Sequence, residues 1–127
     1  MQPVTLEWIE KAEGDFRTAL REMRARKQPN YDATCFHAQQ CAEKYMKAFL
    51  QEKLVPVDKT HDLLRLLSLM PMAIGLQAMQ SQISLLSSAA VEFRYPGEKA
   101  SRETAKESIQ TCASVRHEIR ALLGLSN

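Results

Sequence analysis

Four polar residues that could hold a negatively charged ligand recur along one segment of the chain. The spacings between them are three, four and three residues, and the four residues are His37, Gln40, Lys44 and Lys47. On an α-helix these spacings place the side chains on one face. An imidazole, an amide and two ammonium groups suit the phosphate or carboxylate oxygens of a ligand. This polar stripe therefore predicts either an anion or nucleotide site or a solvated helix face.

A second segment, residues 59–63, reads Lys-Thr-His-Asp-Leu and carries His61 and Asp62. Thr60 could cap a short helix that starts there, and Asp62 would then favour the positive end of the helix dipole. His61 could instead carry a proton or contact a ligand. Both interpretations stay open for this segment.

A third position combines Arg94 and Tyr95 just before Pro96, where a predicted helix must end because proline disfavours helical geometry in the residue before it. Arginine is a natural bidentate partner for phosphate. Pairing of Arg94 with an internal carboxylate, such as that of Asp15 or Glu43, is an equal alternative.

The sequence favours neither a metal nor a cofactor. No two histidines lie close together with a carboxylate at ligand spacing, and neither a G-x-x-x-x-G-K-S/T phosphate loop nor a G-x-S-x-G nucleophile turn occurs. The cysteines, Cys35, Cys41 and Cys112, form no C-x-x-C pair, so they fit neither a disulfide framework nor a zinc site. We therefore predict no metal, no cofactor, and reduced, mostly buried thiols.

Helices must position these side chains, because Ala, Leu, Glu, Lys, Arg, Gln and Met far outnumber Val, Ile and Thr. Apolar residues three or four apart predict helices over about residues 5–26, 31–54, 61–70, 74–93 and 101–123. Only a few residues connect them. We predict an all-α fold, an up-and-down antiparallel four-helix bundle with one additional short helix, as a single helical domain over residues 1–127.

The distribution of charge bears on partners and location. A net charge of +2 is too small to hold a polyanion unless the positive charges cluster, so it argues neither for nor against nucleic acid. No stretch approaches the length of a membrane span and the N-terminus does not resemble a signal peptide, so we expect a cytoplasmic protein with no membrane partner. No charged residue lies between Pro71 and Val91, which predicts either an interior bundle helix or a dimer interface.

Four segments together resemble one known family. They are Trp-Ile-Glu-Lys-Ala-Glu-Gly-Asp-Phe at 8–16, Phe-His-Ala-Gln-Gln-Cys-Ala-Glu-Lys-Tyr-Met-Lys-Ala at 36–48, the segment 59–63, and Phe-Arg-Tyr-Pro at 93–96. Across nearly the whole chain they are similar to the HEPN (higher eukaryotes and prokaryotes nucleotide-binding) domain. The resemblance implies a helical bundle, usually paired as a homodimer, with a polar cleft at or near the dimer interface. It also implies nucleotide binding and work beside a minimal nucleotidyltransferase, often as two halves of a toxin–antitoxin-like pair.

The resemblance carries a ligand-binding role to the positions that match recurrent residues of the family. These positions are His37, Gln40, Lys44, Lys47, His61, Asp62, Arg94 and Tyr95. They form no known catalytic set.

The best-understood activity of the family is metal-independent RNA cleavage by an arginine followed, after four to six residues, by a histidine. No histidine of this chain has an arginine at that spacing, because positions 30–32, 54–56 and 110–112 hold other residues. The resemblance therefore implies the non-catalytic branch that lacks the ribonuclease motif. Two alternatives stay open: a ribonuclease toxin with an atypical site that combines His61 or His37 with Arg94, and a purely structural interaction subunit whose uncharged helix contacts a different protein.

Overall fold

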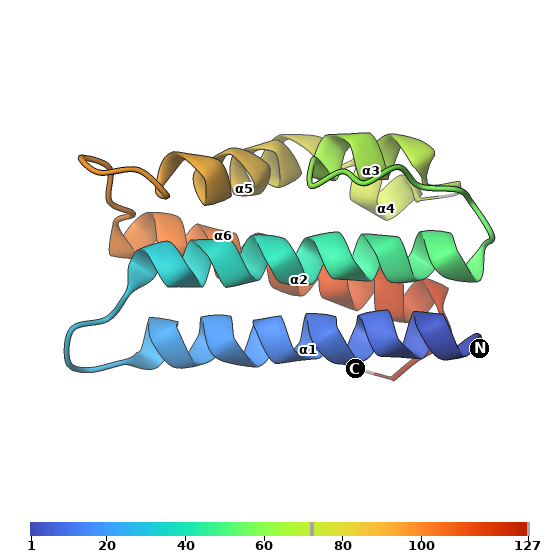
Figure 1. Ribbon diagram of the computed structural model, residues 1–127, viewed down its shortest axis with the longest axis horizontal. Coiled ribbons are helices and arrows are strands. Elements are labelled where there is room, and N and C mark those ends of the chain that lie inside the picture. Colours follow the sequence, from blue (N-terminus) through green and yellow to red (C-terminus); the bar gives the residue numbers. More distant parts are fainter. Residues whose placement is uncertain (72, 127) are drawn as a thin grey trace.

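The computed structural model describes residues 1–71 and 73–126, and within these ranges it contains helices and loops but no strand. The helices are α1 (Pro3–Arg24), α2 (Tyr31–Glu52), α3 (Leu63–Leu69), α4 (Ile74–Gln77), α5 (Gln80–Glu92) and α6 (Arg102–Leu122). The long helices α1, α2, α5 and α6 alternate in direction along the chain (Figure 1). The all-α prediction and the bundle arrangement are confirmed.

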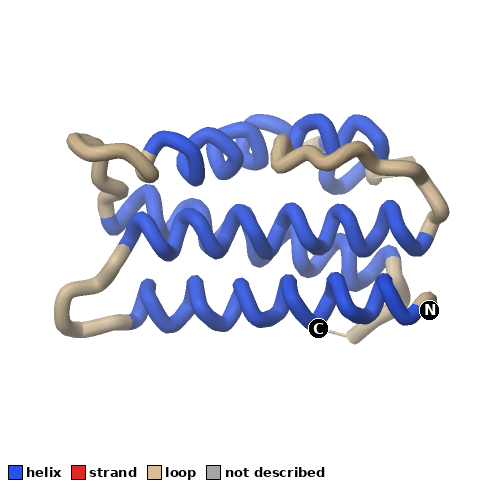
Figure 2. The backbone as a smooth tube through the Cα atoms, in the orientation of Figure 1, coloured by secondary structure: helices blue, strands red, loops and turns tan. Residues whose placement is uncertain are grey.

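Helix α2 is the centre of the bundle. It lies between α1 on one side and α3 and α5 on the other, and it also packs against α6 (Figures 1 and 2). Large side chains of α2, including Tyr45, Met46 and Phe49, are buried in the core. Between them stand alanines and cysteines, which are also buried and whose small size lets neighbouring helices approach closely.

Hydrogen bonds at the helix ends decide where the functional residues lie. The Oδ1 atom of Asn30 accepts from the backbone N–H of Ala33 at 3.0 Å, so Asn30 caps α2 as predicted. The cap of α3 is Asp62 and not Thr60, because Asp62 Oδ1 accepts from Leu64 N–H at 3.0 Å. His61 therefore lies just outside α3, in the segment that connects it to α2.

The uncharged segment differs from its prediction as one helix over 74–93. It is interrupted at Ala78 and Met79, and forms the single turn α4 followed by α5. Leu76, Ile83 and Leu86 point into the core, which agrees with an interior role for one face. The opposite face exposes large apolar side chains, namely those of Ile74, Leu85 and Val91.

Two further sequence predictions concern the core and the membrane. Cys35, Cys41 and Cys112 are all buried and unpaired by disulfides. Burial raises the pKa of the Cys35 thiol, and the neighbouring thiol of Cys112, together with burial, raises the pKa of Cys41 well above its usual value. Among the described helices, none stays apolar over the length that a bilayer requires.

An ion pair joins the first helix to the last. Arg116 Nε and Nη2 each donate to one carboxylate oxygen of Glu13 at 2.7 Å, and the Arg116 guanidinium lies 5.0 Å from the centre of the Phe16 ring. The Arg116 hydrogen bonds hold the pKa of Glu13 below its ordinary value of 4.5. Arg120 donates to the hydroxyl of Tyr45 at 3.1 Å beside this pair.

Substitution of Glu13 by glutamine should make the stability of the protein less dependent on acid pH. The lowered pKa means that ionised Glu13 stabilises the folded state above about pH 4.5, and that this contribution is lost as the pH falls through the folded-state pKa. At pH 7 we expect Glu13→Gln to lower the free energy of unfolding by about 2 kcal/mol. Urea unfolding at pH 7 and pH 3 measures this difference, and an equal loss at both values would contradict the assignment.

Candidate functional site

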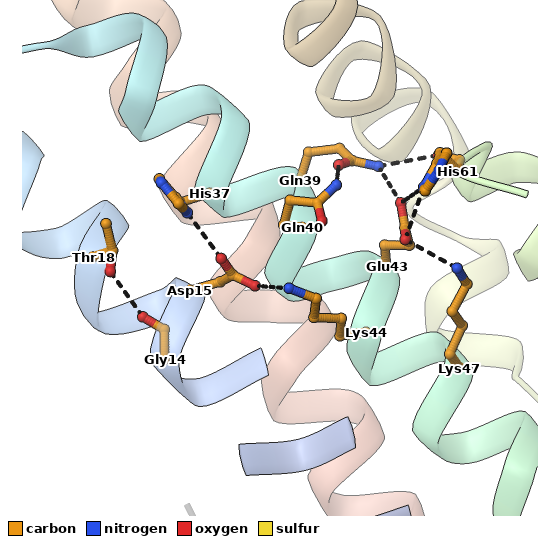
Figure 3. A network of polar contacts seen from close by, with 10 residues as sticks. All are labelled: Gly14, Asp15, Thr18, His37, Gln39, Gln40, Glu43, Lys44, Lys47 and His61. Atoms are coloured by element: carbon orange, nitrogen blue, oxygen red, sulfur yellow. Dashed lines mark hydrogen bonds and ion pairs between the residues drawn. The ribbon is translucent and has the colours of Figure 1, made fainter. Parts of the chain in front are cut away.

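The carboxylate of Asp15 joins α1 to the polar stripe on α2. His37 Nδ1 lies 2.8 Å from Asp15 Oδ1, and the Lys44 ammonium group donates to the other oxygen, Oδ2 (Figure 3). The Asp15 side chain is only 11% exposed. A carboxylate in such a place must be paired, because burial of an unpaired charge is costly. Two members of the predicted stripe therefore serve to neutralise Asp15.

A second carboxylate, that of Glu43, collects the remaining groups. Lys47 Nζ donates to Glu43 Oε2 at 3.0 Å, and His61 Nδ1 lies 3.1 Å from both carboxylate oxygens. Gln39 Nε2 donates to Oε1 at 3.2 Å. The Glu43 side chain is 3% exposed, so these groups replace the water that a surface carboxylate would have. Figure 3 shows that Lys47 reaches Glu43 from α2 and His61 from the segment before α3.

Two amides extend the Glu43 cluster. Gln39 Nε2 also donates to the backbone carbonyl oxygen of His61 at 3.1 Å, which fixes the main chain of the connecting segment on α2. Gln40 Nε2 donates to Gln39 Oε1 at 2.9 Å. Every residue of the predicted stripe thus takes part in hydrogen bonds within the chain, on two successive clusters along α2.

The carboxylates also determine the orientation of both imidazoles. An ionised carboxylate can only accept, so the Nδ1 atoms of His37 and His61 carry hydrogen and the Nε2 atoms face away from Asp15 and Glu43. The two rings differ in exposure. The His61 side chain is 80% exposed, whereas that of His37 is 30% exposed.

A pocket of about 490 Å³ lies beside the Glu43 cluster. Trp8 and the apolar residues 55–57 line part of it, and Lys47, Lys59 and His61 supply cationic or polar groups. Lys47 Nζ also lies 5.6 Å from the centre of the Trp8 ring. The arrangement offers a flat apolar wall next to donors for anionic oxygens, which suits a ligand with both a ring and a phosphate or carboxylate group.

The other predicted site residues lie apart from this pocket or have a different task. Asp62 caps α3, as described above. Arg94 and Tyr95 are exposed in the turn after α5, and within the described ranges neither takes part in the Asp15 or Glu43 clusters. The structure therefore brings together Lys47 and His61 at the pocket, places His37, Gln40 and Lys44 in the supporting network, and does not bring Arg94 to either.

Sequence analysis did not identify Gln39, Trp8 and Lys59 as parts of this site, and it considered Asp15 and Glu43 only as partners for Arg94. One signal was available for Glu43, because it precedes Lys47 by four residues and side chains so spaced meet on a helix. Asp15 has no comparable signal, since its partners lie on another helix.

Comparison with known proteins places the chain. The family model described as the HEPN domain matches residues 5–122. Among solved structures, the fold is similar to that of TT1696 from Thermus thermophilus, with a TM-score of 0.80 and 22% identity over 94% of this chain and 98% of that one. It is also similar to ST0689, an archaeal HEPN homologue, with a TM-score of 0.75 and 23% identity over 97% and 99% of the two chains. Among proteins of curated function, none matches the chain in sequence.

Removal of the charge of Asp15 should destabilise the fold, because Lys44 and His37 would lose their ionised partner. We expect Asp15→Asn, which keeps the size of the side chain, to lower the free energy of unfolding by about 2 kcal/mol. Glu10→Gln is the matched control on the exposed side of α1, with an expected change within about 0.5 kcal/mol. Chemical denaturation compares the two variants, and equal changes would show that Asp15 is not a structural charge.

Proposed function

The chain belongs to the HEPN domain family, and on this premise we propose that it is a non-catalytic, homodimeric binding module for a nucleotide or another phosphate-bearing ligand. We propose further that it acts beside a minimal nucleotidyltransferase in a toxin–antitoxin-like pair. The observation that supports ligand binding is the pocket in which Trp8 faces the cationic groups of Lys47 and Lys59.

The charges around the pocket favour an anionic ligand. Lys59 is exposed at its edge, whereas the carboxylate of Asp58, which also lines it, lies 3.8 Å from Arg65. Lys47 shares its charge with Glu43 but keeps two further N–H donors. The apolar wall at Trp8 would take the base of a nucleotide, since every base offers a flat face for stacking on an aromatic ring.

The remaining stripe residues have a supporting role in this proposal. Lys44 and His37 hold Asp15, and Gln40 holds the amide of Gln39, so they fix α2 rather than face the pocket. The ligand-binding role of Arg94 and Tyr95 stays a prediction. We propose binding in preference to RNA cleavage because, in the described part of the chain, neither His37 nor His61 contacts Arg94.

Nucleotide binding should change the fluorescence of Trp8, which is the sole tryptophan of the chain. Titration with ATP and GTP, followed by fluorescence and calorimetry, should give saturable binding at millimolar concentration or below. Lys59→Ala should weaken it about tenfold, the effect of one lost charge-assisted hydrogen bond. Lys106→Ala, an exposed lysine on α6, should leave it unchanged.

Two outcomes of this titration would contradict parts of the proposal. Absence of binding by the wild type at millimolar nucleotide would remove the small-ligand function. Weaker binding in Arg94→Ala, with an unchanged Lys59→Ala variant, would move the site from the pocket to the turn after α5.

The exposed face of α4 and α5 supports the homodimer part of the proposal. Ile74, Leu85 and Val91 are exposed there, on a segment without charged residues. Leu85 also lines a groove of about 530 Å³ between α5 and α6, whose walls carry mainly apolar, hydroxyl and amide groups. Loss of charged groups and exposure of apolar ones are typical of the centre of an interface.

Placing a charge on this face should separate the two chains. We expect the wild type to have the mass of a dimer in size-exclusion chromatography with light scattering, and Leu85→Arg to have that of a monomer, because burial of an unpaired arginine is costly. Leu6→Arg, at a half-exposed leucine on α1, is the control and should remain dimeric. A monomeric wild type would contradict the dimer, and a complex with a nucleotidyltransferase from native cells would support the paired role.

A further inference from the structure

We propose that His61 is a nucleophile that accepts a phosphoryl group on its Nε2 atom from a small phosphoryl donor held in the pocket beside Trp8. This inference rests on the proposed function insofar as the same pocket must admit phosphate. It goes beyond binding, because it assigns a covalent step to a group that binding alone does not need.

The first support is the way in which the imidazole is held. Glu43 is almost completely buried and places both carboxylate oxygens 3.1 Å from His61 Nδ1. This contact keeps hydrogen on Nδ1 and leaves the lone pair of the neutral ring on Nε2, at the opposite edge of the imidazole. Gln39 holds the backbone carbonyl of the same residue at 3.1 Å, so the ring is fixed through both its side chain and its main chain.

The second support is the accessibility of the reacting atom. The His61 side chain is 80% exposed and lines the pocket, so a donor can approach Nε2 without movement of the bundle. This combination is unusual, because a histidine fixed by a buried carboxylate is commonly buried itself. His37 illustrates the contrast: its Nδ1 is paired in the same way with Asp15, but its ring is 30% exposed and lies outside the pocket.

The third support is the charge near the reacting atom. Lys47 and Lys59 line the same pocket and can neutralise the oxygens of a phosphoryl group. The acidic groups nearby are engaged: Asp62 Oδ1 accepts from the backbone of α3, and Asp58 lies 3.8 Å from Arg65.

The proposed step balances without an oxidant or a metal. The Nε2 lone pair attacks phosphorus, an N–P bond forms, and the bond between phosphorus and the leaving group breaks with its electron pair on the leaving group. With phosphoramidate as the donor, the leaving group is ammonia. The ring becomes an imidazolium that keeps its Nδ1 hydrogen, and the carboxylate of Glu43 at 3.1 Å meets the positive charge that develops there.

The test is incubation of the full chain with phosphoramidate, followed by intact mass and ³¹P NMR. We expect one phosphoryl group per chain, mapped to His61 and absent in His61→Asn, at a rate at least tenfold above that of N-acetylhistidine, which represents a freely exposed imidazole. His37→Asn should react as the wild type does. A rate at His61 equal to that of N-acetylhistidine, or label that is mainly on another residue, would overturn the proposal.

Two further variants separate activation from exposure. Glu43→Gln should lower the rate about tenfold if it remains folded by circular dichroism, because the developing charge loses its partner. Lys59→Ala, at an exposed side chain whose loss should not affect folding, should lower the rate about threefold or more. An unchanged rate in Lys59→Ala would contradict a donor bound in the pocket.

The same preparation distinguishes this inference from the proposed function. If ATP or GTP binds at Trp8 but phosphoramidate labels no histidine faster than N-acetylhistidine, the covalent step is wrong and the binding function stands. If His61 is labelled rapidly but neither nucleotide binds, the nucleotide function is wrong and the nucleophile stands.

Discussion

The buried carboxylate of Glu43 is the constraint on which the rest of the site depends. A charge inside a helical bundle is tolerated only when other groups neutralise it and satisfy its hydrogen bonds. Lys47, Gln39 and His61 do so together, and His61 comes from outside α2. The carboxylate therefore fixes the connecting segment on the central helix and, with it, one wall of the pocket. Asp15 has the same effect between α1 and α2.

The sequence was sufficient to predict the helices and the polar stripe, because both depend on local periodicity. Asn30 as a cap and the short connections also follow from neighbouring residues. Periodicity shows which face a residue occupies but not what lies opposite that face. For this reason the stripe was interpreted as a ligand site or a solvated face, whereas His37 and Lys44 in fact meet a carboxylate on another helix.

Other differences between expectation and structure arise where two local choices are nearly equivalent. Thr60 and Asp62 both favour a helix start, and a chain that must bring His61 to Glu43 uses the later of the two. The interruption at Ala78 has no proline or glycine to mark it, and nothing in the structure explains it. Arg94 belongs to the pocket only if the turn after α5 reaches it, and that depends on packing that a single sequence does not encode in any short pattern.

The packing of cysteines between α2 and α6 gives the protein a built-in record of its own opening. Cys41 and Cys112 lie against each other inside the bundle, and the pKa of Cys41 is raised well above its usual value, so its reactive thiolate form is suppressed. An alkylating reagent in solution has no path to these sulfurs while the two helices remain in contact. Their modification thus counts the moments at which the bundle comes apart, independently of events at the surface pocket.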